Sequence, residues 1–165
     1  MNARHTLPFR GFRLRAGLLA VALFLPGLRA GAASSCSLVS VTGVNFGPYD
    51  VFDGRPATQV GSVVFKCQAG LLPLVPVTIE LSPGNSGIYA FRHLRKGNES
   101  LRYNLHLDAT HTLIWGNGTG GSLPFGPLLP LDNVETSVTI YGQIFPGQNI
   151  TAGSYTDSIT VTINF

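Results

Sequence analysis

Apolar and polar residues alternate along most of this chain, and this period of two limits its fold more than any other feature. In residues 155–165 one set of alternate positions is apolar apart from Asp157, and the other set carries Thr, Ser and Asn. The same alternation runs through 134–144 and 101–108. Successive side chains of a β-strand point to opposite faces, so the pattern predicts half-buried strands in all three segments.

Three shorter segments, 36–46, 63–67 and 77–81, are further strand candidates. Turn-forming residues separate the candidates, and after residue 33 apolar residues do not recur with a helical period. A sheet with one apolar face must bury that face against another layer. The sequence therefore predicts one all-β domain, a sandwich of about six to eight short antiparallel strands.

The first 32 residues have the three-part pattern of a secretory signal peptide. Residues 1–15 are basic, 16–25 are uninterrupted apolar residues, and Ala30-Gly31-Ala32 supplies the small residues of a cleavage site. The apolar run would cover about 15 Å as a helix, half of a ~30 Å hydrocarbon core. We therefore expect residues 1–32 to be a signal peptide, 33–165 to be the exported domain, and the chain to have no transmembrane span.

The basic residues are concentrated in this leader. Five of the eleven lie before residue 30, so 33–165 carries six basic and eight acidic side chains, a formal charge of −2. A nucleic-acid partner is not expected for such a domain.

The expected domain contains two cysteines, Cys36 and Cys67. Two thiols cannot form a zinc site alone, and their spacing is not that of a CxxC motif. In an oxidising compartment they predict one disulfide between the first two strands. Closing a loop of this size stabilises a fold by roughly 3–4 kcal/mol.

No motif predicts catalysis or a cofactor. Residues 116–121 match GxGxxG, but the prolines at 124 and 127 exclude the helix that a dinucleotide site requires. The chain has no GxSxG motif and, with its cysteines paired, no free thiol. We expect a non-enzymatic protein without a cofactor.

His106, Asp108 and His111 allow two interpretations. They could be metal ligands, or they could belong to a solvated polar face opposite Leu105 and Leu107. The second is favoured, and no metal is expected. His93 lies in a basic stretch, 92–96, that we also expect to be exposed.

Several segments, taken in order, resemble the spore coat protein U domain family, which includes subunits of Csu-type pili assembled by the archaic chaperone–usher route. The blocks Arg102-Tyr103-Asn104-Leu105 and Gly153-Ser154-Tyr155-Thr156-Asp157 are the most specific. The other matching segments are Val44-Asn45-Phe46-Gly47, Val64-Phe65-Lys66-Cys67, Trp115-Gly116-Asn117-Gly118-Thr119 and Ile140-Tyr141-Gly142-Gln143-Ile144.

The resemblance implies an incomplete immunoglobulin-like β-sandwich that lacks its last strand and is completed by a donor strand. It also implies export through the periplasm to the cell surface, with a periplasmic pilus chaperone, an outer-membrane usher and neighbouring pilin or coat subunits as partners. The alternation stops at Phe165, so we expect no strand of the chain to follow the last one. The walls of the groove that a donor strand would fill are expected to be Val44 and Phe46 from the first strand and Ile159, Val161 and Ile163 from the last.

Cleavage after Ala32 would leave only Ala33–Ser35 before Cys36, about 10 Å of extended chain against the ~17–20 Å of a typical strand. Such a subunit could accept a strand but not donate one, which predicts a terminal position in a fibre or membership of a coat. N-terminal sequencing of the exported protein checks this cleavage site.

A terminal subunit would also contact a surface, and the apolar residues Leu123, Phe125 and Leu128 are candidates. The favoured alternative is that they form a buried connection between the sheets. Two other functions stay open: a stand-alone surface- or sugar-binding adhesin module, and a small secreted hydrolase.

Overall fold

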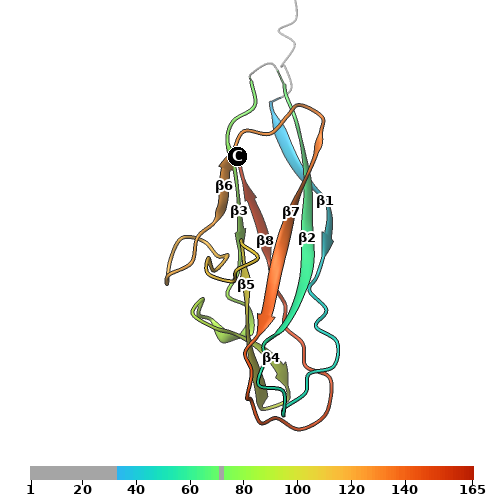
Figure 1. The fold of residues 1–165 in the computed structure, drawn as a ribbon. Coiled ribbons are helices and arrows are strands. Elements are labelled where there is room, and N and C mark those ends of the chain that lie inside the picture. The colour runs from blue at the N-terminus through green and yellow to red at the C-terminus, as the bar shows by residue number, and fades with distance from the viewer. Residues whose placement is uncertain (1–32, 71–72) are drawn as a thin grey trace, which may run out of the picture. The chain divides into compact units, whose positions relative to one another are not determined.

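A computed structural model describes residues 33–70 and 73–165. The chain divides into two compact units, Met1–Ala30 and Gly31–Phe165, and the described residues belong to the second. The expected signal peptide, 1–32, lies outside them. Within the described part, no helix is long and apolar enough to cross a membrane. The elements in chain order are β1 (Ser35–Thr42), β2 (Ala57–Gln68), β3 (Val77–Leu81), the 3₁₀ turn η1 (Gly84–Ser86), β4 (Arg92–Lys96), β5 (Glu99–His106), β6 (Phe125–Leu128), β7 (Glu135–Ile144) and β8 (Val161–Asn164) (Figure 1).

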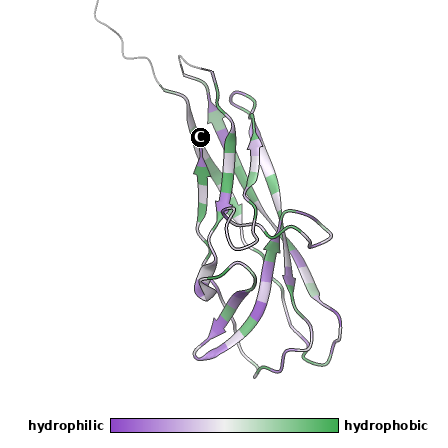
Figure 2. Ribbon diagram, turned by 90° about the vertical axis from the view of Figure 1, so that its left-hand side faces the viewer, coloured by the Kyte–Doolittle hydropathy of each residue, from purple (hydrophilic) through white to green (hydrophobic). Residues whose placement is uncertain are grey.

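The strands form two antiparallel sheets, which confirms the predicted all-β sandwich of incomplete immunoglobulin-like type. One sheet has the order β1-β2-β7-β5-β4 and the other β6-β3-β8. Alternate side chains of β2 and β3 point into the core, and Figure 2 shows this alternation as bands of apolar and polar residues. The fully buried members are Val63, Phe65, Cys67, Val77, Ile79 and Leu81.

The predicted disulfide is present. Cys36 and Cys67 lie directly opposite each other in the β1–β2 pair, with an S–S distance of 2.04 Å. β1 is an edge strand whose only strand partner among the described residues is β2. The disulfide therefore fixes the beginning of an edge strand to a central one.

The last strand is shorter than the alternation predicted. Only β8 is regular, and before it Thr156 makes an isolated bridge to Arg95 in β4. Between them the carboxylate of Asp157 accepts hydrogen bonds from the Asn85 amide (2.8 Å) and the Tyr103 hydroxyl (2.7 Å). Burial and the bond to Asp157 raise the pKa of Tyr103. The one polar residue in the apolar set thus marks where the chain leaves β4 and joins β3.

One lateral side of the sandwich is closed by Trp115. Its backbone N–H donates to Leu105 O in the larger sheet (2.9 Å), and its indole N–H donates to Ile79 O in the smaller one (2.8 Å). Arg92 lies beside it, fully buried. The Arg92 guanidinium donates to Ser82 O, Trp115 O and Asn104 Oδ1, all uncharged acceptors. Together these two side chains seal the space between the sheets.

Three expectations about polar residues were wrong. Arg92 is buried rather than exposed, and His93 in the same stretch is half-buried. His106 is also buried, because the following loop folds back and pairs Ile114 with it. Asp108 accepts hydrogen bonds from the amides of Thr112 and Leu113 and so organises that loop. No cluster of metal-binding side chains occurs among the described residues.

After β1 the chain crosses the inner face of the larger sheet. Two glycines make room for it: a Cβ on Gly61 would lie 2.5 Å from Thr42 O, and one on Gly142 would lie 2.6 Å from Val44 Cγ1. The Phe46 ring then meets the Tyr103 ring edge-on, with centroids 5.8 Å apart. Val44 and Phe46 therefore lie over the middle of the sheet.

We predict that Gly142→Ala destabilises the fold by about 1–3 kcal/mol, because the new methyl group displaces Val44 and Phe46. Gly43→Ala is the matched control, since a Cβ there meets nothing within 4 Å. Urea unfolding of both variants measures the difference. Equal midpoints would show that the crossing segment does not pack on the sheet as described.

Candidate functional site

The described strands leave three sheet edges without a strand partner: those of β1, β6 and β8. The fourth, on β4, carries the bridge to Thr156. β6 contains Pro127 and lies between Pro124 and Pro130, and proline has no N–H to donate to an added strand. β1 and β8 contain neither proline nor a charged residue. Among the described edges, only β1 and β8 are free of the features that block strand pairing.

The inward side chains of β1 are incompletely covered. Leu38 pairs with Phe65 and Val41 with Val63, and both partners are fully buried. Paired residues of an antiparallel ladder point to the same face. Leu38 and Val41 therefore point inward, although 42% and 47% of their surface is exposed.

β8 has the same arrangement in the other sheet. Val161 pairs with Leu81 and Ile163 with Ile79, so both side chains point inward, where they are only half-buried. Cα atoms of β1 and β8 approach within 8 Å of each other, yet no pairing joins the two strands. The two free edges thus lie near each other, and we call the strip of incompletely covered apolar side chains along them the groove.

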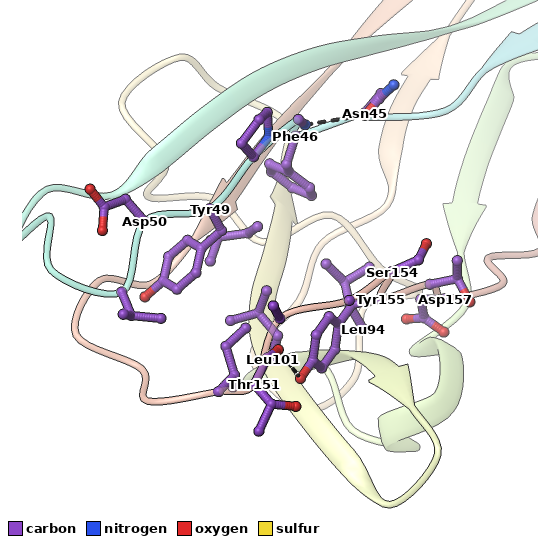
Figure 3. A pocket seen from close by; sticks show the side chains of 18 of the residues that line it. Asn45, Phe46, Tyr49, Asp50, Leu94, Leu101, Thr151, Ser154, Tyr155 and Asp157 are labelled. Atoms are coloured by element: carbon purple, nitrogen blue, oxygen red, sulfur yellow. Dashed lines mark hydrogen bonds between the residues drawn. The ribbon is translucent and has the colours of Figure 1, made fainter.

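A cavity of about 1020 Å³ lies next to the segments that flank the two strands in the chain. One wall is the segment 44–51, which follows β1, and the other is 150–157, which leads to β8. Figure 3 shows Phe46 and Tyr49 on one wall and Tyr155 on the other. Apolar side chains also line the cavity: Leu94, Leu101, Ile144 and Ile150.

The 150–157 wall is held by side chains of the β4–β5 hairpin. Glu99 accepts hydrogen bonds from the hydroxyls of Thr151 (2.9 Å) and Tyr155. Lys96 donates to Ala152 O (2.9 Å) and lies 3.3 Å from the Glu99 carboxylate. The hydrogen bonds from Thr151 and Tyr155 lower the pKa of Glu99 to about 2.

The 44–51 wall is fixed through Tyr49. Its hydroxyl donates to Phe145 O (3.2 Å) and accepts from the Gln148 amide (3.0 Å). Both walls are therefore held by specific hydrogen bonds before any partner binds, and the cavity is preformed.

The structure separates the residues that the sequence assigned to the groove. Val44 and Phe46 line the cavity, while Ile159, Val161 and Ile163 are half-buried along and just before β8. Sequence reasoning did not name Leu38, although Leu38 alternates in step with Cys36, and it missed Val41 because the β1–β2 register shifts between Leu38 and Ser40. This bulge moves the inward positions by one residue, and no period of two reveals it.

The three predicted surface-contact residues do not share one environment. Phe125 and Leu128 are half-buried in β6, paired with Ile79 and Val77, and pack against the core. Leu123 is about half exposed.

Comparison with known proteins matches residues 22–162 to the Spore Coat Protein U domain. The chain belongs to this family. The family match starts inside the expected leader and covers all the strands except the end of β8.

A relative and a solved structure agree with the family assignment. Protein U of Myxococcus xanthus is 33% identical over 148 residues, which cover 82% of this chain and 80% of the relative. A similar fold occurs in the CsuC–CsuE chaperone–tip adhesion subunit pre-assembly complex from archaic chaperone–usher Csu pili of Acinetobacter baumannii. That match has a TM-score of 0.53 and 21% identity, and it covers 80% of this chain but only 40% of the solved chain.

Acid is predicted to loosen the 150–157 wall of this Spore Coat Protein U domain. The pKa of Glu99 is lower in the folded chain than in the unfolded chain, where it is near 4.5. The charged Glu99 carboxylate therefore stabilises the fold at pH values above 4.5, and this stabilisation is lost as the pH falls toward about 2. We expect the Tyr155 ring signals in NMR spectra to titrate in that window. Glu99→Gln should abolish the titration, whereas Glu135→Gln on β7 should leave it unchanged. The same profile in all three proteins would contradict this role of Glu99.

Proposed function

We propose that this protein is an exported structural subunit of a surface fibre or coat, and that a strand from another polypeptide completes its sandwich. The observation that carries the proposal is the pair of unpaired edges, β1 and β8, on either side of an apolar groove. Both edges lack the prolines and charges by which proteins prevent strand addition. A strand between them would satisfy two rows of backbone groups and cover Leu38, Val41, Val161 and Ile163.

The shape of the groove favours entry at the cavity. The two neighbours of a central strand lie about 9.5 Å apart, whereas β1 and β8 approach within 8 Å at their closest. A strand that pairs with both must open this narrow part. The preformed cavity needs no opening, so the incoming strand would dock there first and then pair toward the narrow part.

The family assignment supports an assembly role, and the similar fold comes from a chaperone–subunit complex of a pilus. On this basis a periplasmic chaperone fills the groove first, an outer-membrane usher receives the complex, and a neighbouring subunit then replaces the chaperone. The product would reach the cell surface or be released. No catalytic step is part of this function.

A terminal position in the assembly is a further part of the proposal. It depends on cleavage after Ala32, which leaves too short a segment before β1 to donate a strand. A mature protein that begins near Leu23 would contradict it. The contact of a terminal subunit with a surface would involve Leu123, the exposed member of the three candidates.

Val41→Asp tests strand addition, because it places a charge in the groove at a half-exposed position. Val60→Asp is the matched control, since Val60 is an exposed β-strand valine that pairs with Tyr141 and, alternating with Gly61, points to the outer face. We expect wild-type protein purified from the periplasm to carry one equivalent of a second polypeptide. Val41→Asp should lower that yield at least tenfold and Val60→Asp should not.

Far-UV circular dichroism and thiol titration of both variants show whether the fold and the disulfide survive. A wild-type chain that purifies alone, stays monomeric and refolds reversibly would contradict the proposal. That result would instead favour a self-sufficient binding module.

A further inference from the structure

Exposed apolar side chains gather at the end of the sandwich where β1 and β3 begin and β8 ends. Leu129, Leu131 and Phe165 are 63%, 69% and 54% exposed, and we call them the apolar collar. The strand register places them together at this end. Leu128 pairs with Val77 and Asn164 with Thr78, at the start of β3. Leu129 and Phe165 are the next residues in the chain after Leu128 and Asn164, so both lie beside the start of β3. Figure 1 shows the β6–β7 connection, the start of β1 and the end of β8 at this same end.

The loop that carries Leu131 is fixed in place. The Asn133 amide donates to Cys67 O (2.8 Å), and the Ala69 amide donates to Asp132 Oδ1 (2.8 Å). Asp132 also forms a bridge with Cys67, the residue that the disulfide joins to β1. Because these contacts already order the loop, binding of a partner would cost little conformational entropy in the loop.

The opposite end of the sandwich has a different chemistry. The charged residues Asp50 and Asp157 line the cavity, and Lys96 and Glu99 hold one of its walls. Phe52, which follows the lining segment 44–51, is 93% exposed. The collar segments 128–134 and 163–165 contain no basic residue, and their one acidic residue, Asp132, is engaged within the loop. The collar segments themselves therefore offer no positive charge to anionic lipid, and Lys66 near the end of β2 lies opposite Glu135 of β7.

We propose that the apolar collar is the docking face for the folded domain of a neighbouring subunit in the same assembly. This inference rests on the proposed function and adds a second contact to the inserted strand. The groove is continuous with the collar, because β1 and β8 border both. The prolines of β6 exclude pairing along the adjacent edge, so the contact is made by side chains, end to end. Apolar side chains on an ordered surface are typical of the buried centre of protein interfaces.

The test compares two double substitutions in cells that produce the full chain. Leu129→Ser with Leu131→Ser removes two collar side chains. Ile88→Ser with Leu113→Ser is the control, because it removes two exposed apolar side chains that lie outside the collar and the two edge strands. Three quantities are measured: periplasmic complex with the second polypeptide, protein in sheared high-molecular-weight surface material, and attachment of the cells to an apolar solid.

The collar variant should keep the periplasmic complex and lose at least tenfold of the surface material, while the control keeps both. Wild-type material should resist dissociation in 0.5 M NaCl, since an apolar contact is not screened by salt. Unchanged assembly of the collar variant overturns the inference, and so does a loss of attachment without a loss of assembly, which would make the collar an adhesive surface. Failure of the proposed function itself is distinguishable, because the wild-type chain would then form no periplasmic complex.

Discussion

The structure depends on an asymmetry in how the two sheets are joined. On one lateral side Trp115 hydrogen-bonds to both sheets, and the buried Arg92 guanidinium fills the space beside it. On the other side the strands β1 and β8 face each other without pairing. Burying an arginine that has only uncharged acceptors is costly, and a fully satisfied set of hydrogen bonds offsets that cost. The sealed side therefore supplies the rigidity that the open side lacks.

This asymmetry explains the roles of the other unusual residues. The disulfide fixes β1, which would otherwise be held by one ladder alone. Gly61 and Gly142 let the chain after β1 cross the sheet, which places Phe46 at the cavity. Asp157 ends the pairing with β4 and directs the last strand to β3. Each of these features positions a segment that borders the groove or the cavity next to it.

Much of the fold could be predicted from the alternation, because each half-buried strand carries its own period of two. The strands β5 and β7 and the Cys36–Cys67 pair are where the sequence places them. The burial of Arg92 and His106 could not be predicted, since it depends on loops that fold back from distant positions. His106 lies between Leu105 and Leu107, and Arg92 lies in a basic stretch, as solvent-facing residues do, so only tertiary contacts reveal that they are buried.

The structure places the residues predicted to be groove walls only partly as the alternation suggests. Val161 and Ile163 of the last strand point inward, opposite Leu81 and Ile79. In β1 the inward residues are Cys36 and Leu38 before the bulge and Val41 after it, and the sequence does not reveal this shift. The cavity walls were missed for a different reason. They are irregular segments held by side-chain hydrogen bonds, such as those of Glu99 and Tyr49, and such segments have no periodic signature.

Hydrogen exchange at the outer edges of β1 and β8 tests the central claim most directly. In the purified free chain, amides of these strands that do not bond to β2 or β3 should exchange as fast as exposed loops. In the isolated surface assembly the same amides should be protected at least a hundredfold, because an added strand accepts their hydrogen bonds. Protection of both edges in the free chain, unchanged on assembly, would contradict an incomplete sandwich.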